Sequence, residues 1–345
     1  MFMGIIFACV NDTQDCIDYT KNVAVNLNGE GLEVNTESFK AGMFSGGEFD
    51  PRFLQNITED KIFIFAFNSK EVFPGDLRSR IIDTAYAAYS NGANEVHLVV
   101  PNLSYSRADR DVSYYDKDST HYNNLFGRGA IAKCQADNFK GAGIKSVFTM
   151  DVHSDIVQNY YESIGIRFHN IAQDEVFLDY VKEMDNAVLL AVDLGAKDKI
   201  TKLKEMTGLS AIFLEKIRKS PNNPDELLIS VAGKSDDFTG LKGKTLLIPD
   251  DGVDTGGTFK KACDTIMAKG IDGEVPKNVI GMFTHFWAIL NPSKTLDRFK
   301  DDKIVLTNTI PLVKGFENDN ITVLKTEGLI AKRIIEKELV KEIIV

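Results

Sequence analysis

The segment from 247 to 259, LIPDDGVDTGGTF, sets a turn with hydroxyls and paired glycines directly after an apolar run. A turn that opens a helix points free backbone N–H groups, and the positive end of the helix dipole, at whatever lies in it. Glycines let the backbone approach a ligand closely, and hydroxyls add hydrogen bonds. These properties suit a phosphate monoester, and the residues that would hold it are Thr255, Gly256, Gly257 and Thr258.

Three acids accompany this turn. Asp250 and Asp251 stand at the end of the apolar run, where their carboxylates can accept hydrogen bonds from the vicinal hydroxyls of a sugar. The alternative is that Asp254 caps the following helix and that the glycines serve the turn alone. Two adjacent acids on the end of a buried strand favour a sugar-phosphate site, with Asp254 as a member of it.

A second set of charged residues follows another apolar run, EVHLVVP. Arg107 and Arg110 lie three residues apart beyond the expected strand end, so both can face one cleft and bring forked donors to a polyphosphate. The alternative is a pair of surface arginines that are neutralised by Asp109 and Asp111. The spacing by itself leaves both interpretations open.

Apolar runs recur along the chain, each followed by a polar or glycine-containing turn and a helix-like segment. Residues 74–93 carry apolar positions at helical spacing and stop at Gly92, and residues 258–270 form an amphipathic helix that ends at Gly270. Near-continuous apolar strands that alternate with helices predict buried parallel sheets. The predicted strands are 61–67, 95–101, 146–152, 186–193, 209–215, 245–250 and 277–285, and the segments expected to be irregular are 111–127 and 218–226.

The stretches VVPNLSYSRADR and LIPDDGVDTGGT share one plan, namely an apolar strand, a proline, a polar turn and a helix. This internal echo suggests two similar α/β domains in tandem. We place the domains at 1–165 and 166–330, with a final helix or tail at 331–345.

The bulk properties exclude several classes of protein. A net charge of -10 over 345 residues argues against a sequence-independent nucleic-acid binder, which needs a basic face. The four cysteines show no metal-binding spacing and are too sparse for a disulfide scaffold, so a cytoplasmic location is expected. The opening MFMGIIFACV is short and lacks a basic region, and we interpret it as a first strand and not as a signal peptide or membrane span.

Several of these segments are similar to a known enzyme family. VDTGGT preceded by DD resembles the ribose-phosphate motif shared by type I phosphoribosyltransferases and ribose-phosphate diphosphokinases, the PRPP synthetases. Three further segments resemble the diphosphokinases alone: SYSRADRD their YARQDR stretch, TMDVHSD their DLH segment, and FSGGE at 44–48 their FSDGE loop. The similarity extends, with gaps, from about residue 44 to about residue 335.

This resemblance implies two tandem phosphoribosyltransferase-like α/β domains, each with a parallel sheet flanked by helices. Active sites are then expected between the domains, at the carboxyl ends of strands. The implied reaction transfers the diphosphoryl group of Mg-ATP to the anomeric hydroxyl of ribose 5-phosphate, giving PRPP and AMP. A homo-oligomer is also implied, because in the family the FSDGE loop of a neighbouring subunit completes the adenine pocket.

The resemblance assigns roles to single residues. Mg²⁺ would be held by His153, which spacing alone would leave as a structural histidine, with Asp193 as its carboxylate. Lys216 and Arg218, otherwise an ordinary charged run, match the cations of the family's catalytic loop. ATP would be bound by Phe44, Glu48, Arg107, Asp109 and Arg110, and the ribose phosphate by Asp250, Asp251, Asp254, Thr255, Gly256, Gly257 and Thr258.

The chain also departs from the family pattern. Ala108 stands where the family has a glutamine near adenine, Gly46 replaces the acid of the FSDGE loop, and Ile217 replaces the middle arginine of the KRR loop. These changes leave room for the same chemistry on another 5-substituted ribose, such as ADP-ribose. Two further hypotheses are a phosphoribosyltransferase, which would not need Arg107 or Lys216, and a non-catalytic regulatory homologue.

Overall fold

The computed structural model describes residues 4–117, 120–192, 194–220, 223–311 and 319–340, and the side chains of 120–121, 216–230 and 258 lie outside this description. The chain divides into two compact units. The first unit comprises Met1–Ile171 together with Thr326–Val345, and the second comprises Ala172–Lys325.

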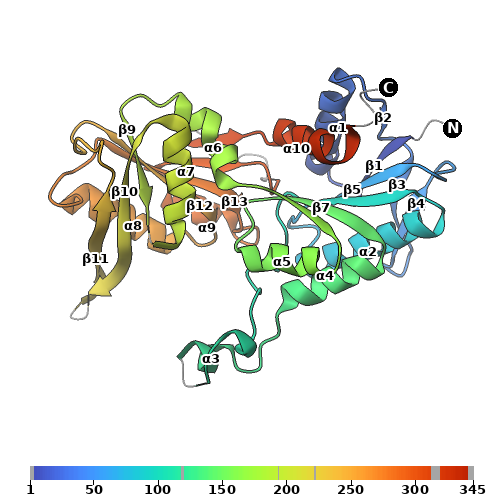
Figure 1. The fold of residues 1–345 in the computed structure, drawn as a ribbon, viewed down its shortest axis with the longest axis horizontal. Helices are drawn as coiled ribbons and strands as arrows, with labels where there is room; N and C mark the ends of the chain where they lie inside the picture. Colours follow the sequence, from blue (N-terminus) through green and yellow to red (C-terminus); the bar gives the residue numbers. More distant parts are fainter. Residues whose placement is uncertain (1–3, 118–119, 193, 221–222, 312–318, 341–345) are drawn as a thin grey trace. The chain divides into compact units, whose positions relative to one another are not determined.

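The first unit is built on a six-stranded parallel sheet in the order β2-β1-β5-β6-β7-β8 (Figure 1). Every residue of β5 is buried, as expected for a parallel strand covered on both faces. The fold class that the alternating pattern predicted is therefore confirmed. The strands are β1 (Ile5–Cys9), β2 (Val34–Asn35), β5 (Lys61–Phe65), β6 (Glu95–Val99), β7 (Ile144–Met150) and β8 (Arg167–Ile171).

Helices cover both faces of this sheet, with α2, α4 and α5 along one face and α1 and α10 along the other (Figure 1). The helix α2 (Pro74–Ser90) buries Leu77, Ile81, Ala85 and Ala88, whose spacing predicted it. An antiparallel hairpin joins β3 (Phe39–Met43) to β4 (Phe49–Phe53). The remaining helices are α1 (Gln14–Gly29), α4 (Ile131–Gly141), α5 (Asp155–Ser163) and, within the segment expected to be irregular, η1 (Val112–Tyr114) and α3 (Thr120–Leu125).

The end of the chain returns to the first unit. The helix α10 (Glu327–Ile334) and the π-helical turn η3 (Ile335–Leu339) follow Thr326, whose hydroxyl lies 2.8 Å from the hydroxyl of Tyr19 on α1. The strand β8 pairs with β7, so the first unit extends to Ile171 and not to residue 165 as the sequence suggested. The segment that the sequence set apart as a tail is thus part of the first unit.

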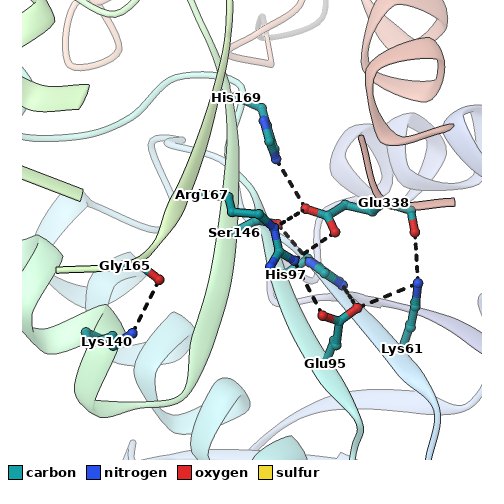
Figure 2. A network of polar contacts seen from close by, with 9 residues as sticks. All are labelled: Lys61, Glu95, His97, Lys140, Ser146, Gly165, Arg167, His169 and Glu338. Atoms are coloured by element: carbon teal, nitrogen blue, oxygen red, sulfur yellow. Dashed lines mark hydrogen bonds and ion pairs between the residues drawn. The ribbon is translucent and has the colours of Figure 1, made fainter. Parts of the chain in front are cut away.

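A network of acids and cations fastens this returning segment at the amino ends of β5, β6 and β8 (Figure 2). The guanidinium of Arg167 donates to both carboxylate oxygens of Glu338, at 2.8 and 2.9 Å. The ammonium of Lys61 donates to the main-chain oxygen of Glu338 at 2.8 Å and lies 3.6 Å from Glu95. Burial acts to raise the pKa of Glu338, but hydrogen bonds from His169 and Arg167 outweigh it and lower this pKa to about 2.

His97 lies fully buried inside this network. Its ring stacks on Phe63 at 4.5 Å, and its Nδ1 lies 2.7 Å from the hydroxyl of Ser146. The other ring nitrogen is 3.7 Å from a carboxylate oxygen of Glu95, which is too far for a hydrogen bond. Burial lowers the pKa of His97 to about 3, so the folded protein holds this imidazole neutral.

The buried imidazole predicts that acid weakens the fold. An unfolded chain binds a proton on His97 below its ordinary pKa of about 6.5, whereas the folded chain does not until about pH 3, so stability falls as the pH drops through this window. Between pH 7 and pH 5 the loss is about 2 kcal/mol. The variant His97→Gln should lose less stability over this range by about that amount, measured by urea denaturation at both pH values. Equal pH dependence in both proteins would contradict this.

The second unit contains a seven-stranded sheet in the order β11-β10-β9-β12-β13-β14-β15, in which only the β10 and β11 pair is antiparallel. Its strands are β9 (Ala187–Ala191), β10 (Ser210–Ser220), β11 (Asn223–Lys234), β12 (Thr245–Val253), β13 (Asn278–Phe286), β14 (Lys303–Thr307) and β15 (Ile321–Leu324). Its helices are α6 (Gln173–Lys182), η2 (Leu194–Ala196), α7 (Lys197–Thr207), α8 (Gly257–Lys269) and α9 (Pro292–Arg298).

The segment 218–226 differs from the sequence-based prediction. It was expected to be irregular because it is rich in proline and asparagine, but its described residues belong to a long hairpin. Arg218 pairs with Leu228 and Ser220 with Asn223. Pro224 is tolerated there because β11 is the edge strand of the sheet, where a missing N–H need not face a partner.

Candidate active site

The glycine turn of the second unit lies between β12 and α8, as the sequence predicted. Gly256 adopts a left-handed conformation with φ 67°, and α8 begins at the next residue. The first intrahelical bond runs from the amide of Lys260 to the oxygen of Gly256 at 2.9 Å. The amides of residues 257–259 therefore have no acceptor within the helix and are free to bind an anion.

The alternative in which Asp254 merely caps the helix is wrong. The N-cap residue is Gly256, which makes no side-chain cap, and Asp254 is exposed two residues before it. The main-chain oxygen of Asp254 accepts a hydrogen bond of 3.1 Å from the hydroxyl of Thr295 on α9. Because the backbone is fixed in this way, the carboxylate of Asp254 remains at the surface beside the turn.

Close packing fixes the shape of the turn. A Cβ atom on Gly256 would lie 2.4 Å from the ring of Phe299, and one on Gly252 would lie 2.8 Å from the ring of Trp287. Phe299 is buried and contacts Phe259 and Phe283 edge-on or tilted, so its ring has no room to move away. Both glycine positions therefore exclude larger residues.

Asp250 and Asp251 lie in the last part of β12 and not just beyond it, because the strand continues to Val253. Asp250 pairs in register with Phe283 on β13, and its carboxylate accepts a 2.9 Å hydrogen bond from the amide of Asp251. Both residues are half-buried. The two acids and the turn thus stand at one edge of the sheet, its carboxyl end.

In the first unit, Asp109 brings two of the predicted motifs together. The hydroxyl of Ser154 donates to the Asp109 carboxylate at 2.6 Å, and the hydroxyl of Tyr160 donates to the main-chain oxygen of Asp109 at 2.8 Å. This joins the segment after β6 to the start of α5, where His153 is exposed. Asp109 itself is buried, so these two hydrogen bonds fix the segment in place.

The two arginines beyond β6 differ in their surroundings. Arg107 is exposed, whereas Arg110 is half-buried, donates to the hydroxyl of Tyr115 at 2.8 Å and lies 3.6 Å from Asp109. Asp111 instead accepts hydrogen bonds from the amide and hydroxyl of Ser113. The alternative in which acids neutralise these arginines is therefore met in part, since Arg110 lies beside Asp109 while Asp111 accepts hydrogen bonds from Ser113.

The FSGGE segment forms the tip of the β3–β4 hairpin. The amide of Phe44 donates to the oxygen of Glu48 at 2.9 Å, and Gly47 turns the chain with φ 88°. Both side chains point to solvent, and Phe44 is 54% exposed. A large exposed aromatic at a hairpin tip suits a contact with another molecule.

Some predicted residues lie outside the described part of the chain. Asp193 is one of them, and so are the side chains of Thr258, Lys216 and Arg218. The backbone of Lys216 and Arg218 runs through β10, so the expected loop for these cations is a strand of the long hairpin.

Within the residues that the structure describes, one cluster of three groups could hold a metal by geometry, namely Glu95, His97 and Glu338. It lies at the amino end of the sheet, whereas His153 follows the carboxyl end of β7. Lys61 and Arg167 already neutralise its two carboxylates, so a divalent cation would add uncompensated charge. We therefore assign this cluster to the fold and not to a metal.

Comparison with known proteins identifies the relatives of this chain. Residues 13–119 match the family described as the N-terminal domain of ribose phosphate pyrophosphokinase. Ribose-phosphate pyrophosphokinase of Wolinella succinogenes is 26% identical, covering 91% of this chain and 93% of that protein. Ribose-phosphate pyrophosphokinase 4 of Saccharomyces cerevisiae is also 26% identical, covering 75% of this chain and 72% of that one. Residues 13–119 thus match the N-terminal domain of this family, and the chain is similar to ribose-phosphate pyrophosphokinases over most of its length.

The fold agrees with this family. The crystal structure of phosphoribosylpyrophosphate synthetase from Mycobacterium smegmatis superposes with a TM-score of 0.73 at 20% identity, covering 97% of this chain and 99% of that one. The chain therefore has the expected architecture of two α/β units in tandem. In its described part no helix has the length and apolar character needed to cross a membrane.

Residues near the glycine turn were missed by reasoning from sequence. The sequence pattern assigned no role in the site to Trp287, Phe299, Lys294 or Arg298. These residues lie in or just after β13 and α9, the strand and helix that follow the glycine turn and α8 in the sequence. The tight contact between Gly252 and Trp287 exists only in three dimensions.

Proposed function

We propose that this protein transfers the β,γ-diphosphoryl group of Mg-ATP to the anomeric hydroxyl of a 5-phosphorylated ribose, with ribose 5-phosphate as the simplest acceptor. One observation carries this proposal: a free helix N-terminus at Gly256 and Gly257 stands beside the paired acids Asp250 and Asp251 at the carboxyl end of β12. Similarity to the pyrophosphokinase family and the activity in the names of its relatives support it.

The proposed reaction is an in-line displacement without a covalent enzyme intermediate. The hydroxyl oxygen on C1 of the ribose attacks the β-phosphorus of ATP and loses its proton to solvent. The bond between the β-phosphorus and the oxygen that bridges it to the α-phosphorus breaks, and AMP leaves with that oxygen. The protein contributes by positioning both substrates and by stabilising charge at the transferred group.

Each predicted residue then has a place in the reaction. The turn amides and Thr255 would hold the 5-phosphate, and Asp250 with Asp251 would accept hydrogen bonds from the ribose hydroxyls. Arg107 and Arg110 would bind the polyphosphate of ATP, with Asp109 fixing their segment. Phe44 and Glu48 would contact adenine across a subunit boundary, which requires a homo-oligomer.

Magnesium is part of this proposal. Mg²⁺ usually keeps several waters and takes few protein ligands in addition to substrate phosphates, so an all-protein cage is not required. His153 fits because it is exposed at the start of α5, beyond the carboxyl end of β7, and Asp193 would supply the carboxylate. When bound, the ion would neutralise charge on the phosphate oxygens of ATP.

The test is AMP formation from Mg-ATP, followed by chromatography, with ribose 5-phosphate offered as acceptor and a reaction without acceptor as control. We expect AMP and a ribose 1-diphosphate in equal amounts, and none of either without acceptor. AMP without the sugar diphosphate would indicate simple hydrolysis. If no acceptor yields AMP, a phosphoribosyltransferase or a regulatory homologue becomes the better interpretation.

Lys216 gives a further prediction within this proposal. Replacing Lys216 by alanine should lower kcat at least about tenfold while the KM values change little, because the cation would act on charge that develops in the transition state. Lys219→Ala, on the same strand, is the matched control and should keep near-normal kcat. Steady-state AMP formation measures both. A rise in KM with unchanged kcat would instead make Lys216 an ordinary binding residue.

A further inference from the structure

A hollow of about 230 Å³ opens directly beside the phosphate turn of the second unit. Its wall includes Asp254 and Thr255 from the turn, the indole of Trp287 after β13, and Lys294 and Arg298 from α9. The hollow is therefore continuous with the place where the 5-phosphate of the acceptor would lie.

Within the described part of the chain, the two cations of this wall make no direct ion pair, and the exposed carboxylate of Asp254 on the same wall offsets part of their charge. Among the residues that the structure describes, neither Lys294 nor Arg298 makes a hydrogen bond or an ion pair. Arg298 reaches the turn itself, since a Cβ atom on Gly257 would lie only 2.7 Å from its Nη1 atom. The turn amides and Thr255 already offer donors for one phosphate monoester, so these two side chains supply donors for a further phosphoryl group.

Trp287 adds a flat apolar surface to the same hollow. The indole is half-buried and is held against Gly252, where the missing side chain leaves it room. A fixed indole offers a face on which an aromatic base can stack. Beside it, the exposed side chain of Leu290 lines the hollow and extends the apolar surface.

We infer that this hollow receives the group attached to the 5-phosphate of the acceptor. Arg298 and Lys294 bind a second phosphoryl group, and Trp287 stacks a base beyond it. The acceptor class is then a ribose linked through its 5-oxygen to a diphosphate, as in ADP-ribose. This inference rests on the proposed function, because the C1 hydroxyl is the same nucleophile, the β-phosphorus is the same electrophile, and AMP is the same leaving group.

The experiment compares kcat/KM for ADP-ribose and for ribose 5-phosphate in the full chain and in the variant Arg298→Ala. We expect ADP-ribose to be the better acceptor, and its kcat/KM to fall at least about tenfold in the variant, as for loss of one charge-assisted hydrogen bond. The ratio of the two acceptors should shift toward ribose 5-phosphate. Lys300→Ala removes a nearby exposed cation that does not line the hollow, and should leave the ratio unchanged.

The outcomes separate the inference from the proposed function. A lower kcat/KM for both acceptors by the same factor would place Arg298 at the 5-phosphate and overturn the inference, with the proposed function intact. Preference for ribose 5-phosphate in the unmodified protein would overturn it as well. If neither acceptor yields AMP, the proposed function fails, and calorimetric binding of ADP-ribose without ATP still decides the inference, which requires weaker binding to Arg298→Ala than to the unmodified chain.

Discussion

Replacing Glu338 by alanine is expected to lower the free energy of unfolding by about 3 kcal/mol. The side chain of Glu338 is only 5% exposed, and its carboxylate receives two hydrogen bonds from Arg167. Removing the acid takes the carboxylate partner from His169 and leaves Arg167 with only its 3.5 Å contact to Glu95. The loss is at the lower end of the range for broken buried pairs because the side chain of Arg167 is 46% exposed and water can partly solvate it.

Glu336 provides the matched control for this change. It lies in the same π-helical turn, is 46% exposed, and makes only long contacts, 3.9 Å to Lys332 and 3.7 Å to Arg333. Glu336→Ala should therefore cost less than about 1 kcal/mol. Urea denaturation of both variants at pH 7, followed by circular dichroism, measures the difference. Equal losses in the two variants would mean that the network does not fasten the returning segment.

The second large effect is expected at Gly256. An alanine there must adopt φ near 67° and would place its Cβ atom 2.4 Å from the ring of Phe299, so the turn has to move. The left-handed conformation costs about 1 to 2 kcal/mol and the overpacking about 1 to 3 kcal/mol. Displacing the amides of α8 by about 1 Å should lower kcat/KM for the acceptor at least about a hundredfold in the AMP assay.

Gly273 is the control that separates the cost of a left-handed backbone from the effect of displacing the glycine turn. It has a similar φ of 80°, but a Cβ atom there would meet nothing within 4 Å. Gly273→Ala should thus cost only the backbone term, about 1 kcal/mol, and keep near-normal kcat/KM. Thermal denaturation and the AMP assay on both variants give the comparison. Normal acceptor kinetics in Gly256→Ala would place the 5-phosphate elsewhere.

Local patterns in the sequence were sufficient for the parallel sheets and for the glycine turn that opens α8. Runs such as IFIF at 62–65 are apolar throughout because a strand between two helical layers is buried on both faces. Gly256 and Gly257 stand where a helix opens at a strand end, and this meaning is carried by neighbouring residues alone. For the same reason the helix α2 could be predicted from the spacing of its buried residues.

The hairpin of β10 and β11 could not be predicted in this way. The prolines and asparagines near residue 221 favour an irregular segment, and the pattern does not show that strands continue on either side of them. The length of these strands is set by backbone pairs such as Ile217 with Ile229. Such pairs form only where an edge of the sheet can accept another strand. At such an edge, pairing with the neighbouring strand outweighs the low intrinsic strand propensity of proline and asparagine.

Tertiary structure alone decided the return of the C-terminal segment and the hollow beside the turn. Glu338 meets Lys61, which is 277 positions earlier, and no short-range pattern can encode that pairing. Likewise Arg298 lies beside the glycine turn only because α9 places its guanidinium next to Gly257. The sequence by itself determined the helices, the strands and the glycine turn, since hydrogen-bonding period and backbone freedom are local properties. Which charges meet depends on the packing of whole elements, and that is settled only when the chain is folded.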